Sequence, residues 1–187
     1  LLIIFQPELR RALVHLGEGP FFGFGGMGIK SIIDEITEAI IIMSKRKIGA
    51  LIAIEREIGP KNYIETGVKL NAVISSEMLT TIFMPNTPLH DGGVVIQEDL
   101  IAGAACTFPL SQSLSLDRIM GTRHQAGLGI TEETDAMVFI VSEETGTVSF
   151  AYKGKLSRGI DEDGIRHILA NIYKVSRKKR LERIWKK

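Results

Sequence analysis

Three short polar segments combine residue types that could bind phosphate groups or a metal ion. The first, His90-Asp91-Gly92-Gly93, places an imidazole and a carboxylate before two glycines and precedes an apolar run at residues 94–96. The carboxylate could hold a divalent cation or position a hydroxyl, and the glycines would let a ligand approach the backbone closely. Taken alone, an Asp-Gly pair is usually just a tight turn.

Of the other two segments, one has side chains suited to an anion and the other could form a polar rim that contacts a ligand. Thr122-Arg123-His124-Gln125 gives a hydroxyl, a guanidinium and an imidazole in a row. The forked donors of Arg match phosphate oxygens. Residues 142–146 follow an apolar strand-like run, and α/β proteins often bind ligands at such strand ends. Each segment is also compatible with a solvated polar turn, so neither identifies a site by itself.

A glycine-rich stretch at residues 23–28 satisfies the G-x-G-x-x-G pattern of dinucleotide-binding loops. That pattern requires a strand immediately before it. Here a helix is expected instead, because Pro7 stands at a helix start and Gly17 follows its end. We therefore interpret this stretch as a connector. The sequence contains no G-K-[ST] phosphate loop.

Composition limits the classes of protein that the chain could represent. With 187 residues, 44% of them hydrophobic and 24% charged, the chain can form one domain with a buried core. The net charge of +1 argues against a nucleic-acid-binding protein with a broad basic surface. The single cysteine, Cys106, excludes an internal disulfide and a cysteine metal cluster, and its apolar neighbours predict a buried, structural thiol.

Apolar periodicity predicts the elements that position these segments. Helices are expected at residues 7–16, 29–45 and 162–175, with a shorter one ending at residue 83. Strands are expected at residues 50–54, 94–96, 101–106, 137–141 and 147–152. The stretch 121–130 is ambiguous. This order of helices and strands predicts a single α/β domain with a mixed central β-sheet flanked by helices.

We divide the chain into three parts. Residues 1–28 are expected to be a helical linker and glycine-rich connector, residues 29–175 the catalytic or binding domain, and residues 176–187 a basic tail. The apolar residues 1–5 are compatible with a short lead-in or with the end of a membrane segment. The tail is compatible with a solvated helix end or with contact to a membrane surface.

Together, in this order and spacing, the three polar segments resemble the diadenylate cyclase family (the DisA_N-type or DAC domain), whose signatures are Asp-Gly-Ala and Arg-His-Arg. The similarity covers residues 29–175. Residues 47–55 resemble the first core strand of the family, and residues 75–77 and 84–96 resemble its central segment. Residues 5–11 resemble the linker after the membrane helices of the membrane-anchored, CdaA-like class, which favours a truncated membrane segment ahead of a cytosolic domain.

The resemblance implies an enzyme that joins two ATP molecules into cyclic di-AMP across a face-to-face homodimer and releases two pyrophosphates. It implies a divalent cation, Mg²⁺ or Mn²⁺, held by Asp91 and His90. Asp91, Arg123 and His124 would be the catalytic residues. The residues expected to line the nucleotide pocket are Gly92, Gly93, Thr107, Phe108, Thr122, Ser142 and Glu143.

The chain departs from the family pattern at three positions. Gly93 replaces Ala, a change that we expect to be tolerated. Thr107 stands where related chains often carry a Tyr beside the adenine, which would weaken stacking unless Phe108 compensates. Gln125 replaces the second Arg, which removes a charge beside the phosphates. The alternative is therefore a weakly active or inactive domain that binds ATP or cyclic di-AMP, and a purely structural domain is a further alternative.

The resemblance also implies partners and a location. A YbbR-domain regulator and phosphoglucosamine mutase are the regulatory partners expected for the CdaA-like class, and no nucleic acid is expected. The location implied is the cytoplasmic face of the cell membrane, reached through an N-terminal membrane segment.

Overall fold

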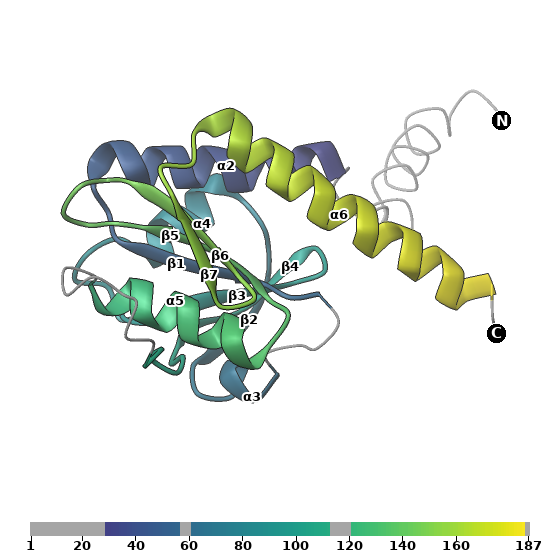
Figure 1. Cartoon of the computed structure of the whole chain (residues 1–187), viewed down its shortest axis with the longest axis horizontal. Coiled ribbons are helices and arrows are strands. Elements are labelled where there is room, and N and C mark those ends of the chain that lie inside the picture. Colours follow the sequence, from purple (N-terminus) through teal and green to yellow (C-terminus); the bar gives the residue numbers. More distant parts are fainter. Residues whose placement is uncertain (1–28, 57–60, 113–120, 186–187) are drawn as a thin grey trace, which may run out of the picture.

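A seven-stranded mixed sheet forms the centre of the structure, a computed structural model that describes residues 29–56, 61–112 and 121–185 (Figure 1). The strand order is β2-β4-β3-β1-β5-β6-β7. Among these strands β1 pairs parallel with β3, and every other neighbouring pair is antiparallel. The strands are β1 (Ala50–Ile54), β2 (Val68–Val73), β3 (Gly93–Gln97), β4 (Leu100–Cys106), β5 (Met137–Val141), β6 (Val148–Tyr152) and β7 (Lys155–Arg158). The predicted mixed α/β fold is confirmed.

Helices cover both faces of this sheet (Figure 1). On one face α2 (Ile29–Arg46) packs against α4 (Ser76–Ile82) and α6 (Glu162–Trp185). On the other face lie α5 (Thr122–Glu133) and the short α3 (Lys61–Ile64). Strand β1 is buried along its whole length because its alternate side chains enter the two separate cores on either side of the sheet.

The predicted elements of the core are confirmed, and the others differ for identifiable reasons. The helix expected at residues 7–16 and the glycine-rich stretch lie outside the described residues. Helix α6 continues to Trp185, so the boundary drawn at residue 175 falls inside it. Strands β2 and β7 were not predicted. The four residues of β7 are mostly polar and exposed, whereas β2 does alternate apolar and polar residues, and the prediction missed this pattern. Among the described residues, no helix is long and apolar enough to cross a bilayer.

The ambiguous stretch 121–130 forms helix α5, whose glycines explain the ambiguity. A Cβ at Gly127 would lie 2.8 Å from Cγ1 of Ile140. A Cβ at Gly129 would lie 2.8 Å from the carbonyl carbon of Pro109 and closer still to its oxygen. Glycine lowers helix propensity, but here it lets the helix backbone approach the sheet and the loop after β4. Tertiary packing, rather than local helix propensity, therefore stabilises this helix.

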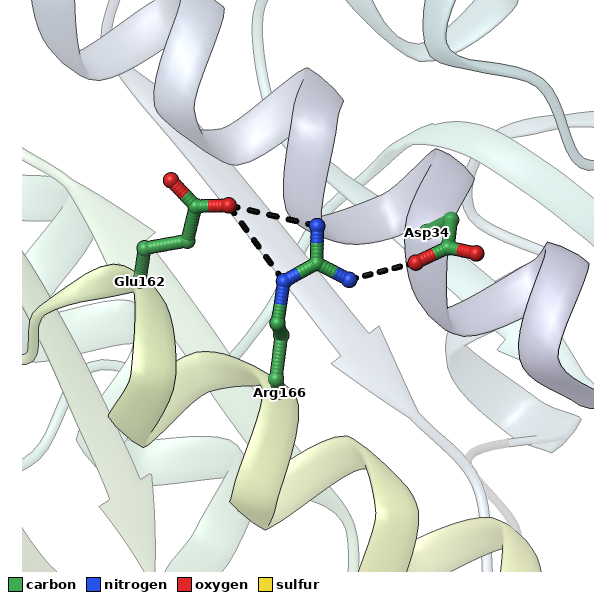
Figure 2. A network of polar contacts seen from close by, with 3 residues as sticks. All are labelled: Asp34, Glu162 and Arg166. Atoms are coloured by element: carbon green, nitrogen blue, oxygen red, sulfur yellow. Dashed lines mark hydrogen bonds and ion pairs between the residues drawn. The ribbon is translucent and has the colours of Figure 1, made fainter.

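Helices α2 and α6 are joined by a charged cluster as well as by apolar packing (Figure 2). The guanidinium of Arg166 donates to Asp34 on α2 and to Glu162 one turn earlier on α6. The side chains of Arg166 and Asp34 are 40% and 47% exposed, so water screens this pair. Beneath the cluster, Leu169 is fully buried in the core shared with α2.

We therefore expect the apolar contact to stabilise this helix pair more than the ion pairs do. Arg166→Ala should lower the free energy of unfolding by less than about 1 kcal/mol. Leu169→Ala should lower it by about 2–5 kcal/mol, because it leaves a cavity. Urea unfolding followed by circular dichroism measures both. An Arg166→Ala loss as large as that of Leu169→Ala would contradict this ranking.

Candidate active site

All three polar segments meet at one edge of the sheet. Strands β1 and β3 run parallel, so both begin at this edge. The antiparallel neighbours β5 and β4 end there, as the pairs Ala50–Val141 and Gly93–Cys106 show. The Asp91 segment before β3 and the Glu143 segment after β5 therefore lie on the two sides of the start of β1.

A pocket of about 230 Å³ opens on the β5 side of this edge. It is formed by the first turn of α5, the turn between β5 and β6, and the end of β7. Five residues expected to bind nucleotide or act in catalysis line it, namely Thr122, Arg123, His124, Ser142 and Glu143. The other lining residues are Gly121, Val141, Glu144, Thr145, Thr147, Ser149 and Arg158.

The β5–β6 turn that carries Ser142 and Glu143 is anchored to the end of α2. The Ser44 hydroxyl donates to the carbonyl oxygen of Gly146 at 2.6 Å. Gly146 has a φ of +75°, and a Cβ there would overlap the carbonyl oxygen of Ser44. Only glycine satisfies both the left-handed backbone and the close approach. This anchor fixes the position of Ser142 and Glu143 at the pocket.

Arg123 and Glu143 form an ion pair across the start of β1. A Cβ at Gly49 would lie 2.5 Å from Nη1 of Arg123 and 2.9 Å from Oε2 of Glu143, so the missing side chain makes room for the pair. The side chain of Arg123 is 24% exposed, whereas that of Glu143 is 64% exposed. The guanidinium is thus held at the pocket by a carboxylate that water can reach, and an anionic ligand could take that carboxylate's place.

His124 lies deeper in the same pocket. Its Nε2 is 3.3 Å from the hydroxyl of Ser149, a buried residue of β6. Burial lowers the pKa of His124 below its ordinary value of 6.5, and the positive charge of Arg158 lowers this pKa further. At neutral pH the imidazole is therefore uncharged, so it can orient a ligand by hydrogen bonding but adds no positive charge.

The Asp91 segment lies on the other side of β1, where two glycines fit against β4. Gly92 has a φ of +117°, and a Cβ there would lie 2.8 Å from the carbonyl oxygen of Cys106. A Cβ at Gly93 would lie 2.8 Å from Cζ of Phe108 and closer still to Cε2. The Phe108 ring thus fills the space that an alanine Cβ would occupy.

The residues that follow β4 have little room to move. Phe108 is only 6% exposed and packs edge-on against Tyr63, with ring centroids 6.0 Å apart. The backbone N–H of Thr107 donates to the Thr66 hydroxyl at 2.9 Å. Phe108 therefore supports the Asp91 segment from beneath.

The predicted burial of Cys106 is confirmed, and this burial raises the pKa of its thiol to about 11, which leaves the thiol protonated at neutral pH.

His90 and Asp91 fit a metal ion that is completed by ligand oxygens. Nδ1 of His90 lies 2.5 Å from the carbonyl oxygen of Thr87, which can only accept, so Nδ1 carries the proton and Nε2 keeps its lone pair. The side chain of Asp91 is exposed. No group of three or more metal-ligating side chains occurs in the described part of the chain. The Asp91 carboxylate suits Mg²⁺ or Mn²⁺, which bind one or two carboxylates together with phosphate oxygens, whereas an imidazole ligand such as His90 is less usual for these ions.

The structure therefore divides the predicted site residues into two groups. Five line the pocket, while His90, Asp91, Gly92, Gly93, Thr107 and Phe108 gather at the adjoining ends of β3 and β4. Gln125, the departure expected to weaken phosphate binding, is not among the described residues that line the pocket. Its carbonyl oxygen accepts the backbone N–H of Ser111 at 3.0 Å.

The pocket residues that sequence reasoning missed include Ser149 and Arg158, which are paired on β6 and β7. The sequence signal that could have located them is the two-residue hairpin turn formed by Lys153 and Gly154. Both turn residues have positive φ, of 49° and 67°. Such a two-residue turn joins adjacent antiparallel strands. Identifying this turn would have predicted β7 and placed Arg158 beside β6.

The fold and this edge define an α/β domain that presents a carboxylate segment and a polar pocket on either side of one central strand. The sequence also matches a known protein family. The family described as DisA bacterial checkpoint controller nucleotide-binding, or DAC, matches residues 37–156. The chain belongs to this family.

Individual relatives agree with this assignment. The chain is 51% identical over 178 residues to the cyclic di-AMP synthase CdaA of Bacillus subtilis, an alignment that covers 93% of this chain and 65% of CdaA. It is 35% identical over 175 residues to the diadenylate cyclase of Mycoplasma pneumoniae, covering 90% and 86% of the two chains. A crystal structure of a DacA double mutant from Staphylococcus aureus superimposes with a TM-score of 0.76 at 45% identity, covering 77% of this chain and 96% of the DacA chain in that structure. The chain thus spans a little under two thirds of the length of CdaA.

Gly93 and Phe108 should behave as a matched pair. Gly93→Ala should lower the free energy of unfolding by about 1–3 kcal/mol, because its Cβ forces the buried Phe108 ring to move. Adding Phe108→Leu should recover part of that loss, since the smaller side chain frees the space. Urea unfolding of both single variants and the double variant gives the coupling energy. Strictly additive losses would contradict the proposed contact.

The charge of Arg158 should be measurable at His124. Arg158→Gln should raise the pKa of His124 towards 6.5 without reaching it, because burial remains. Lys155→Gln, which removes a charge from the same strand but not from the pocket lining, should leave the pKa unchanged. Titration of the imidazole signals by NMR, assigned with a His124→Asn variant, measures both. Equal changes in the pKa of His124 in the two variants would contradict an electrostatic interaction between Arg158 and His124.

Proposed function

We propose that this chain is the catalytic domain of a diadenylate cyclase, which condenses two ATP molecules into cyclic di-AMP and releases two pyrophosphates. The observation that carries the proposal is the position of the Arg123–His124 pocket and the Asp91 segment at one sheet edge, on either side of β1. The relatives named as cyclic di-AMP synthase and diadenylate cyclase support it, at 51% and 35% identity.

In this proposal the nucleotide lies across the start of β1. The base and ribose occupy the β3–β4 side, where Gly92 and Gly93 allow close approach and Thr107 and Phe108 shape the surface. The phosphates occupy the β5 side, where the first turn of α5 presents Thr122 and backbone N–H groups whose helix dipole favours an anion. The side chains of Arg123, His124, Ser142 and Glu143 complete this part of the site.

Asp91 is the residue proposed to act on the attacking group. The 3′-hydroxyl of one ATP attacks the α-phosphorus of the other, a new P–O bond forms, and the bond to the β-phosphate oxygen breaks. Asp91 accepts the hydroxyl proton, and pyrophosphate leaves with the bonding electron pair. Arg123 exchanges its contact with Glu143 for phosphate oxygens, so its charge stabilises the crowded phosphates as the reaction proceeds.

A divalent cation, Mg²⁺ or Mn²⁺, would be held by Asp91 and His90 together with oxygens of the α-phosphate and would supply positive charge at the reacting phosphate. The fixed Nδ1–H of His90 orients its Nε2 for this contact.

Catalysis is proposed to need two copies of the chain facing each other. Each copy supplies one nucleotide site, and the product contains two new bonds, each joining one nucleotide to the other. Holding both nucleotides in line can contribute about 7–11 kcal/mol to lowering the barrier. A positioned base contributes about 10²–10⁴-fold, which is less. An isolated copy should therefore bind ATP without forming product.

The resemblance to the CdaA-like class supports three further proposals. The domain is held at the cytoplasmic face of the cell membrane by a preceding membrane segment. Its regulatory partners are a YbbR-domain protein and phosphoglucosamine mutase. No role in nucleic-acid binding is proposed.

The proposal predicts cyclic di-AMP formation whose rate rises more steeply than in proportion to protein concentration. Asp91→Asn should abolish product while retaining ATP binding, because it removes the base but little of the phosphate pocket. Asp163→Asn, which neutralises an exposed carboxylate on α6, is the matched control and should be fully active. Chromatography of reactions with ATP and Mg²⁺ or Mn²⁺ measures the product.

Binding of ATP without product, with either metal and at high protein concentration, would reject the cyclase proposal. It would favour the alternative of a nucleotide-binding domain. Unchanged turnover in Asp91→Asn would reject the catalytic role of Asp91 but not the cyclase proposal.

A further inference from the structure

Arg158 is a pocket residue that neither family signature contains. It ends β7, and its pairing partner across the hairpin is Ser149. Paired residues on neighbouring strands direct their side chains to the same face of a sheet. Ser149 contacts His124 on α5, so Arg158 lies on the face that α5 covers and lines the pocket there.

The charges around this pocket leave the guanidinium of Arg158 available. Arg123 is paired with Glu143, whereas no salt bridge of Arg158 occurs within the described ranges. Glu144 is the second acidic residue of the lining and is exposed. Burial is the main cause of the lowered pKa of His124, and the positive charge of Arg158, which lines the same pocket, lowers this pKa further. An anion in the pocket would interact favourably with the charge of Arg158 and could accept hydrogen bonds from its guanidinium.

The order of the strands indicates which part of a nucleotide Arg158 would meet. Starting from the Asp91 segment on β3, the sheet continues through β1 and β5 to β6 and β7. Adjacent strands are about 4.8 Å apart, so β7 lies roughly 19 Å from β3 along the sheet. A triphosphate that extends from the β3 side across β1 reaches Arg123 first, and its outer phosphates come nearest to Arg158.

We propose that Arg158 binds the outer phosphates of the nucleotide, the pair that leaves as pyrophosphate. This assignment rests on the proposed function and adds a specificity residue to it: Arg158 distinguishes a nucleoside triphosphate from a monophosphate. It also gives the pocket a second guanidinium. The family's second signature Arg corresponds to Gln125, which does not line the pocket in the described structure.

The test uses 3′-deoxy-ATP and 3′-deoxy-AMP, which lack the attacking hydroxyl, so binding is measured without turnover. Calorimetric titration of the full chain with Mg²⁺ should give an affinity for 3′-deoxy-ATP that falls about tenfold or more in Arg158→Gln, since charge-assisted hydrogen bonds to phosphate are lost. The affinity for 3′-deoxy-AMP should change less than twofold. The affinity of Arg158→Lys for 3′-deoxy-ATP should lie between those of the unaltered chain and Arg158→Gln. Inorganic pyrophosphate should compete with 3′-deoxy-ATP less well in Arg158→Gln than in the unaltered chain.

Lys155→Gln is the matched control, because it removes one positive charge from the same strand at a residue outside the pocket lining. It should leave all affinities unchanged. The inference is overturned if Arg158→Gln weakens both nucleotides equally, weakens neither, or has no more effect than Lys155→Gln.

The outcome is separable from that of the proposed function. If the unaltered chain binds 3′-deoxy-ATP but makes no cyclic di-AMP from ATP, the cyclase proposal fails, and the Arg158 comparison still decides the inference. If the unaltered chain does not bind 3′-deoxy-ATP, both are overturned. Circular dichroism of each variant checks that the fold is retained.

Discussion

The pairing of β1 with β3 on one side and with β5 on the other is the constraint on which the rest of the structure depends. Because β1 runs parallel to β3 and antiparallel to β5, the segment before β3 and the turn after β5 reach the same edge. The buried side chains of β1 fill both cores, so its position cannot shift without loss of packing on two faces. Two groups far apart in sequence therefore flank one site.

The sequence predicted the parts of this arrangement that bury long apolar patterns. Helix α2 and strands β1 and β5 were predicted because their apolar residues recur with helical spacing or in short uninterrupted runs. Strand β7 was not predicted, because its exposed side chains are mostly polar and its conformation depends on pairing with β6. The apolar alternation of β2 was present in the sequence but was missed. Helix α5 was ambiguous, since its glycines serve tertiary packing against Ile140 and Pro109 and oppose local helix propensity.

The candidate site shows the same division. Short signatures identified Asp91, Arg123 and Glu143 as candidates, because residue type and order were enough. The ion pair between Arg123 and Glu143 depends on the empty space at Gly49, and the position of Phe108 depends on that at Gly93. The place of Arg158 depends on hairpin register. None of these relations is local in the sequence, so only the folded backbone reveals them.

The contact between Arg123 and Glu143 makes occupancy of the pocket an exchange of one anion for another. A ligand binds Arg123 only if it interacts with the guanidinium more favourably than the carboxylate of Glu143 does. Because the side chain of Glu143 is mostly exposed, its release into water costs little free energy. Chloride, acetate and other singly charged ions at ordinary concentrations would gain little from this exchange. At Arg123 the ion pair thus favours multiply charged ligands over singly charged ones.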